Sequence, residues 1–158
     1  MTTTAATQGT PIIHEVFAYL VARDAARAID FYKSVFGARE TMRLDYQGKV
    51  GHAELAFGPT TIMIADEFPE GGIQSPLAFG GTGTRVHLHV DNVDRLAERA
   101  AAEGATILYG PSDEPHGERQ CRLRDPFGHE WLLGHTITRM SPDEIKEAYR
   151  RVEESDAG

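Results

Sequence analysis

Cysteine is scarce in this sequence, basic residues are outnumbered, and long apolar runs are missing. The one cysteine, Cys121, excludes an internal disulfide and a zinc site built from several cysteines, and it favours the reducing cytoplasm. With 16 Lys and Arg against 24 Asp and Glu, the formal charge is -8, which argues against nucleic acid or an anionic membrane as a partner. No segment reaches the roughly 20 apolar residues that span a bilayer, and the start MTTTAATQGT lacks the regions of a signal peptide. We therefore expect a cytoplasmic protein, with a flexible tail at residues 1–10.

A repeated pattern organises the rest of the chain. In the first half, Asp24 is followed by AARAIDFYKSVF and then by Gly37; in the second half, Asp91 is followed by NVDRLAERAAAE and then by Gly104. Each Asp is suited to cap a helix N-terminus, and each Gly is suited to end the helix in a left-handed conformation. The chain therefore contains two copies of one unit, each built around a helix.

Each predicted helix lies between short strands. One strand with alternating apolar residues precedes the helix, and three strands separated by turns follow it. We predict an α+β fold in which two tandem βαβββ modules form a curved mixed sheet around a concave pocket, with an additional C-terminal helix. The predicted segments are a tail at 1–10, modules at 11–66 and 84–138, a linker loop at 67–83, and a helix and tail at 139–158.

The segment RVHLHV, residues 85–90, indicates which face of the sheet carries the function. Its three apolar residues alternate with Arg85, His87 and His89, as expected of a strand that is buried on one side only. The same period of two, applied to other strands, predicts a half-polar concave face, which is the default candidate for a binding site. Its predicted members are Glu15, Phe17, Tyr19, Val21, His52, Glu54, Met63, Arg85, His87, His89, Glu130 and Leu132.

Two motifs give the modules a family resemblance. AIDFYKSVFGA in the first half and DPFGHEW in the second together resemble the vicinal oxygen chelate superfamily, which includes glyoxalase I, fosfomycin- and bleomycin-resistance proteins and extradiol dioxygenases. With HAEL, IMIAD and HGER added, the series is similar to the PhnB-like subgroup of small bacterial proteins. The resemblance covers residues 12–138 and implies one domain of this fold. It does not imply one function, because a fold can host many chemistries.

The resemblance also implies where metal ligands would lie. Metal-dependent members place His or Glu ligands on the first, fourth, fifth and eighth strands. The matching positions here are Phe17, Met63, Arg85 and Leu132. None of these side chains is a ligand for zinc or for a hard cation. We therefore expect that the usual metal site is missing and that the protein has no cofactor.

Two classes of function stay open, so the sequence does not decide whether the chain is an enzyme. The first is a protein that binds and sequesters a small organic molecule, as in resistance. The second is a lyase or isomerase in which His52, Glu54 and His87 move protons, with a displaced divalent metal at these residues as a less favoured form. The missing ligands favour the first class, and the density of ionisable groups favours the second. The predicted ligand-binding residues are Phe17, Tyr19, Met63, Arg85, His89, Glu130 and Leu132.

The family resemblance also implies that the chain assembles with a second copy of itself. Members of the superfamily pair their modules within one chain or between two chains, so we expect a homodimer with two equivalent pockets. The predicted C-terminal helix has an apolar stripe that needs to be buried, and we expect this helix at or near the dimer interface. The stripe consists of Ile145, Ala148, Tyr149 and Val152.

Overall fold

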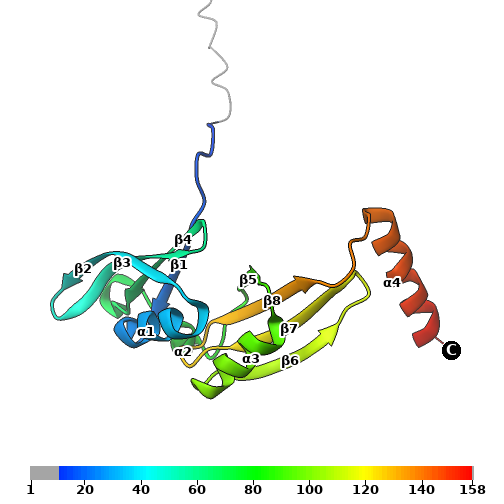
Figure 1. Ribbon diagram of the computed structural model, residues 1–158. Coiled ribbons are helices and arrows are strands. Elements are labelled where there is room, and N and C mark those ends of the chain that lie inside the picture. The colour runs from blue at the N-terminus through cyan, green and yellow to red at the C-terminus, as the bar shows by residue number, and fades with distance from the viewer. Residues whose placement is uncertain (1–10, 158) are drawn as a thin grey trace, which may run out of the picture.

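The computed structural model describes residues 11–157, and the chain folds twice as one strand, one helix and three further strands (Figure 1). The predicted tail at 1–10 lies outside the described residues. The first module contains β1 (Ala18–Ala22), α1 (Ala25–Phe36), β2 (Arg39–Tyr46), β3 (Lys49–Phe57) and β4 (Thr60–Asp66). The second contains β5 (Arg85–His89), α3 (Val93–Ala102), β6 (Thr106–Asp113), β7 (Glu118–Arg124) and β8 (Glu130–Thr136), and α4 (Pro142–Asp156) follows it.

The strands form two four-stranded mixed sheets. Their strand orders are β1-β4-β3-β2 and β5-β8-β7-β6, so one topology occurs twice. In each module the first strand runs parallel to the last, and the other neighbours are antiparallel. The predicted α+β fold of two tandem βαβββ modules with a C-terminal helix is confirmed, and its strands are divided between two sheets.

Side-chain caps fix the start of the main helix in both modules. The Asp24 side chain accepts a backbone N–H at the start of α1, and Gly37 ends this helix with a φ of 68°, as predicted. In the second module, Asn92 caps α3 in place of the predicted Asp91. Asn and Asp cap helices about equally well, so the sequence pattern cannot choose between two such neighbours.

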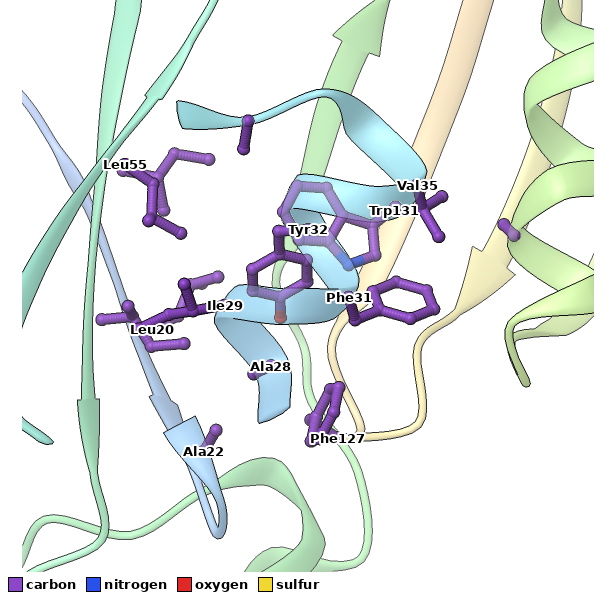
Figure 2. Packing of buried hydrophobic residues seen from close by; sticks show 14 of the residues in the cluster. Leu20, Ala22, Ala28, Ile29, Phe31, Tyr32, Val35, Leu55, Phe127 and Trp131 are labelled. Carbon is purple, nitrogen blue, oxygen red and sulfur yellow. The ribbon is translucent and has the colours of Figure 1, made fainter. Parts of the chain in front are cut away.

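An aromatic cluster joins the two modules (Figure 2). Tyr32 and Phe36 of α1 lie with their ring centroids 5.2 and 4.7 Å from that of Trp131 on β8. Trp131 also stacks on Phe57 of β3, and it is fully buried. One continuous core therefore serves both sheets.

The segment before β1 is extended and exposed. The period of two places Glu15 and Phe17 on the first strand, but β1 starts at Ala18, which pairs with Ile62 near the beginning of β4. β4 therefore offers no partner to Glu15. Residues 11–17 run away from the two modules (Figure 1), and their large apolar side chains face solvent.

The linker at 67–83 contains two short helices. They are η1 (Pro69–Gly71) and α2 (Pro76–Phe79), and each ends at a glycine with a positive φ. The Glu67 carboxylate accepts hydrogen bonds from the backbone N–H and the hydroxyl of buried Ser75. The Gly and Pro residues of this segment thus shape short helices that connect the sheets.

The C-terminal helix α4 lies beyond the end of the second sheet (Figure 1). It begins with the reciprocal hydrogen bonds of a capping box between Ser141 and Glu144. None of its side chains is buried, and Tyr149 and Val152 of the predicted stripe are 43% and 38% exposed. None of the helices among residues 11–157 is long and apolar enough to cross a membrane.

Candidate functional site

The candidate site is the sheet surface opposite the helices, which we call the open face. On the helix side, residues such as Leu55 on β3 and Leu133 on β8 are completely buried, whereas the residues that alternate with them keep some exposure. The open face consists of Tyr19, His52, Glu54 and Met63 on the first sheet, and of Arg85, His87, His89, Glu118, Gln120, Arg122, Arg124, Glu130 and Leu132 on the second.

Three polar side chains meet on the first sheet. The Tyr19 hydroxyl lies 2.7 Å from His52 Nδ1, and His52 Nε2 lies 3.5 Å from Glu54 Oε1. Met63 is the register partner of both Tyr19 and Glu54, so it lies between them. Partial burial raises the pKa of the Tyr19 phenol. A phenol, an imidazole and a carboxylate in this order can relay a proton.

At the start of the second sheet, a carboxylate lies between two arginines. Glu130 accepts a hydrogen bond from Arg124 Nη2 at 3.0 Å, and its other oxygen lies 3.5 Å from Arg85 Nε. Arg85 and Glu130, both predicted to bind ligand, are therefore paired with each other.

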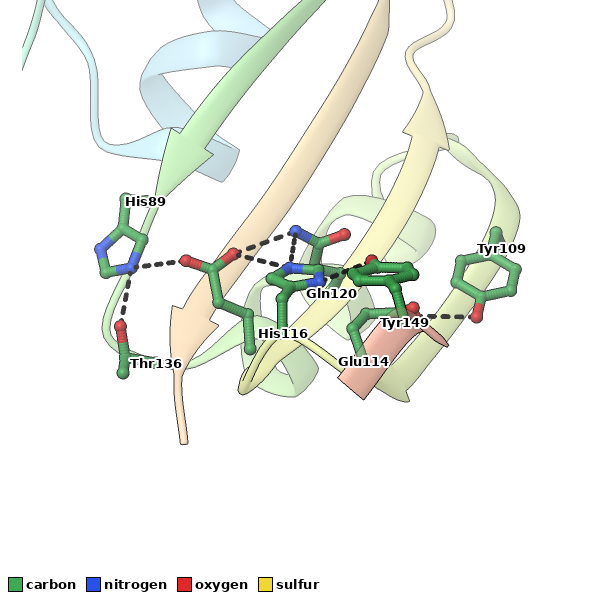
Figure 3. Close-up of polar contacts among 8 residues, drawn as sticks. His89, Tyr109, Glu114, His116, Gln120, Thr136 and Tyr149 are labelled. Atoms are coloured by element: carbon green, nitrogen blue, oxygen red, sulfur yellow. Dashed lines mark hydrogen bonds and ion pairs between the residues drawn. The ribbon is translucent and has the colours of Figure 1, made fainter. Parts of the chain in front are cut away.

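Imidazoles surround a carboxylate at the other end of this sheet (Figure 3). Glu118 Oε1 lies 3.6 Å from His89 Nε2, and Glu118 Oε2 lies 3.5 Å from His116 Nε2. A hydrogen bond of 3.0 Å from the Gln120 amide, together with the charges of nearby histidines, lowers the pKa of Glu118. The Glu118 cluster, which we define as Glu118, His89, His116 and Gln120, therefore holds an ionised carboxylate.

Hydrogen bonding connects the Glu118 cluster to the C-terminal helix. An ionised Glu118 only accepts hydrogen bonds, so the Gln120 atom beside it has to be the amide nitrogen. The same nitrogen lies 3.1 Å from His116 Nε2. His116 Nδ1 lies 2.9 Å from the Tyr149 hydroxyl, so this ring links the Glu118 cluster to α4.

His87 belongs with the Glu118 cluster and not with the other predicted catalytic residues. A Cβ on Gly134 of β8 would lie 2.8 Å from His87 Nε2 and 3.1 Å from Glu118 Oε2, so both side chains reach over this glycine. His52 and Glu54 lie on β3, in the other sheet. The predicted catalytic residues are thus divided between the two sheets, and their action as one set stays a prediction.

The structure also bears on metal binding. Within residues 11–157, no group of three or more His, Cys, Asp and Glu side chains is arranged to hold a metal ion. A displaced metal at His52, Glu54 and His87 is therefore not supported. Of the positions matched to the family's ligands, Met63 and Leu132 lie mid-strand, Arg85 begins β5, and Phe17 directly precedes β1.

Sequence reasoning missed the contribution of β7. Cys121 and Leu123 of this strand are buried, so the period of two places Glu118, Gln120 and Arg122 on the open face. The alternation is present in ERQCRLR and could have been used. The link from His116 to α4 had no such signal, because the two residues it joins are 33 positions apart.

Two surface hollows lie between the sheets. One of about 310 Å³ is lined by Tyr19, Phe79 and Glu130, among others, and therefore adjoins two predicted ligand-binding residues. Another of about 380 Å³ lies between Phe57, Val86 and Leu96. Both volumes fall at the lower end of the range for small-molecule sites.

Comparisons with known proteins agree with this architecture. The family model described as Glyoxalase/Bleomycin resistance protein/Dioxygenase superfamily matches residues 12–133. The uncharacterised protein Rv0887c of Mycobacterium tuberculosis is 40% identical over 134 residues, which are 82% of this chain and 79% of that protein. The crystal structure of TioX from Micromonospora is 30% identical, covers 81% of this chain and 100% of TioX, and has a TM-score of 0.61.

A more distant structure shows the likeness of fold alone. The fosfomycin resistance protein FosX from Mesorhizobium loti is 18% identical, covers 82% of this chain and 95% of its own, and has a TM-score of 0.57. At this identity the likeness does not extend to ligand or chemistry.

Proposed function

Because the chain belongs to the Glyoxalase/Bleomycin resistance protein/Dioxygenase superfamily, we propose that it binds a small organic molecule on the open face and sequesters it, as in resistance. The observation that carries this proposal is the exposure of large side chains beside the open face. Tyr19 of β1 is 50% exposed and Phe17, directly before β1, is 40% exposed, although the opposite side of the first sheet is densely packed. Exposed aromatic groups next to ion pairs suit an amphipathic ligand.

The proposed ligand contacts combine apolar and polar groups. Phe17, Tyr19, Met63 and Leu132 supply apolar surface, and His89 supplies a hydrogen-bonding group. Arg85 and Glu130 form an ion pair that a ligand can displace. No metal is needed for binding of this kind.

The test is calorimetric titration of the protein with aromatic compounds and antibiotics, beginning with bleomycin and fosfomycin. Tyr19→Ala should weaken binding of a hit by about 1–3 kcal/mol, because a half-exposed ring becomes buried against the ligand. Ile137→Ala, which removes a side chain that is 51% exposed beyond the end of β8, is the control and should leave affinity unchanged. Equal affinity of wild type and Tyr19→Ala would exclude the first sheet from the site.

Acid–base catalysis by a lyase or isomerase is a second candidate function. The chain of contacts from Tyr19 through His52 to Glu54 favours it, because it aligns a phenol, an imidazole and a carboxylate. Under this hypothesis His52→Asn abolishes turnover but leaves ligand affinity within about threefold. A binding protein without catalysis shows no turnover in wild type or variant.

We also propose that the chain forms a homodimer. Support comes from apolar groups that one copy leaves uncovered: Ile12, Ile13 and Val16 are 78%, 79% and 82% exposed, and Val152 of α4 is 38% exposed. Sedimentation equilibrium should show a dimer, and Val152→Asp should shift it towards monomer if α4 lies in the interface. A dimer that is unchanged by Val152→Asp would place the interface elsewhere.

Subgroup and location are proposed on narrower grounds. The motif series from AIDFY to DPFGHEW supports membership of the PhnB-like subgroup. The one cysteine, Cys121, is buried and free, which is compatible with the reducing cytoplasm. Fractionation of the native host tests the location directly.

A further inference from the structure

We infer that the ligand carries an oxyanion, a carboxylate or a phosphate, and that Arg122 of β7 binds it at the centre of the second sheet's open face. This inference rests on the proposed binding function and names the chemical class of the ligand. Arg122 was not among the residues that sequence reasoning selected.

The first observation is the state of the Arg122 guanidinium. Its Nε is buried without a hydrogen-bond partner, the one such side-chain nitrogen or oxygen among residues 11–157. A buried donor that has lost water and gained no partner costs about 1–3 kcal/mol. Such a group is retained at a cost to stability and needs an explanation, and a functional role is one of the recognised explanations.

The second observation is that the other arginines of this sheet are already paired. Arg85 and Arg124 share Glu130, and Arg119 is held by Asp94 at 2.7 Å and by Asp113. Within residues 11–157, Arg122 forms no ion pair with a carboxylate. Its charge is therefore left for an external anion.

The third observation concerns what lies beside Arg122. Its register partner on β8 is Leu132, and Leu132 pairs in turn with His87 of β5. Glu118, two positions beyond Gln120 on the same strand, already accepts a hydrogen bond from that amide. The register partner on β8 therefore offers an apolar floor, and Glu118 is already engaged by Gln120, which leaves the guanidinium charge to attract an external anion.

The geometry of the arginine indicates how the anion is held. Among the three guanidinium nitrogens of Arg122, only Nε is both buried and without a hydrogen-bond partner. An anion that approaches from solvent therefore meets the two terminal nitrogens, Nη1 and Nη2. Two parallel N–H donors match the two oxygens of a carboxylate or of a phosphate. The organic part of the ligand then lies over Leu132.

The experiment compares three probes of one shape by calorimetric titration of the full chain: naphthoate, naphthyl phosphate and naphthamide. Arg122→Gln should weaken naphthoate or naphthyl phosphate by about tenfold or more, the loss of a charge-assisted hydrogen bond, and leave neutral naphthamide unchanged. The stronger of the two anions identifies carboxylate or phosphate. Arg119→Gln, which removes an equal charge that Asp94 and Asp113 already hold, is the matched control and should change affinity by less than about threefold.

Different results would contradict the oxyanion inference in different ways. If naphthamide binds as tightly as the anions and Arg122→Gln changes nothing, the oxyanion inference fails while the proposed binding function stands. If none of the probes and none of the antibiotics bind, both fail. If Arg122→Gln alters the monomer–dimer equilibrium but not naphthoate affinity, the charge pairs with a second copy and the inference is overturned.

Arg122→Lys, which keeps the charge but not the paired donors, should give an intermediate loss of affinity for the anionic probe.

Discussion

Asp125 is the residue with the densest hydrogen bonding in the core. Its Oδ2 accepts the Tyr32 hydroxyl at 2.7 Å and Trp131 Nε1 at 2.9 Å. Its Oδ1 accepts the backbone N–H groups of Phe127 and His129 at 2.9 and 3.0 Å. Burial, and the negative charge of Asp125 beside it, raise the pKa of Tyr32 well above its usual value. Four donors thus stabilise a carboxylate that is 3% exposed.

Replacing Asp125 by Asn should lower the free energy of unfolding by about 2–4 kcal/mol. The Asn side chain has one acceptor oxygen, whereas the Asp side chain has two. Two of the four donors therefore lose their acceptor, and they face the N–H groups of the new amide instead. Urea denaturation followed by circular dichroism measures the change. Asp30→Asn, on the exposed side of α1, is the control and should stay within about 0.5 kcal/mol. A similar small effect at Asp125 would contradict this account of the core.

The role of Asp125 shows what sequence can predict for a single residue. The Pro and Gly of DPFG favour a turn, and the Gly128 N–H bonds back to the Asp125 carbonyl. The contact with Tyr32 spans 93 positions and leaves no local pattern. Parity placed Tyr19 beside Met63 correctly, but which side chains actually bond to each other depends on rotamers that the sequence does not specify.

At the scale of elements, hydrogen bonds to one acidic side chain, Glu67, hold the start of the linker in place. Hydrogen bonds from the Ser75 hydroxyl and backbone N–H, and further the charge of Arg23, lower the pKa of Glu67. Glu67 directly follows β4, and Ser75 directly precedes α2. These bonds therefore fix the start of the connection between the two sheets.

Glu67→Gln should remove a part of the pH dependence of stability. The folded pKa of Glu67 is lower than its unfolded pKa of about 4.3, so the stabilisation is complete above that pH and is lost as pH falls through the folded pKa. The difference in unfolding free energy between wild type and variant should be about 1 kcal/mol at neutral pH and shrink below about pH 4. Urea titrations across this range test it. Glu70→Gln, at an exposed position of the same linker, is the control and should leave the free energy of unfolding at neutral pH within about 0.5 kcal/mol.

Elements were predictable where periodicity is strong. α1 and its two caps follow from sequence, as does the capping box of α4. The limits of β1 were not predictable, because they depend on where the partner strand β4 begins. Whether an apolar stripe is covered could not be predicted from local pattern either, since no residue of the α4 stripe is buried in this chain.

The whole molecule has two sheets but one core. The aromatic cluster of α1, β3 and β8 contains residues from both modules, and no separate core is needed to describe either. The duplication of the modules was predictable from spacing in the sequence. Their division into two sheets was not, because the pattern of apolar residues is the same whether the modules share a sheet or not.

Thermal unfolding should therefore occur in one transition. Because the shared core couples the modules, the calorimetric enthalpy should equal the van't Hoff enthalpy at a fixed protein concentration. Phe36→Ala should lower the midpoint and still leave one transition, if the remaining cluster is sufficient for coupling. Two resolved peaks in the wild type would show that the modules unfold independently.

The buried position of Trp131 gives the protein an optical property. It is the chain's one tryptophan, it is completely shielded from solvent, and it faces the helices instead of the open face. Its emission should be blue-shifted and insensitive to soluble quenchers. A ligand bound over Leu132 does not touch the indole, so a change in fluorescence on binding reports that one sheet has moved relative to the other. If calorimetry detects ligand binding but Trp131 fluorescence does not change, the two sheets keep their relative position when the ligand binds.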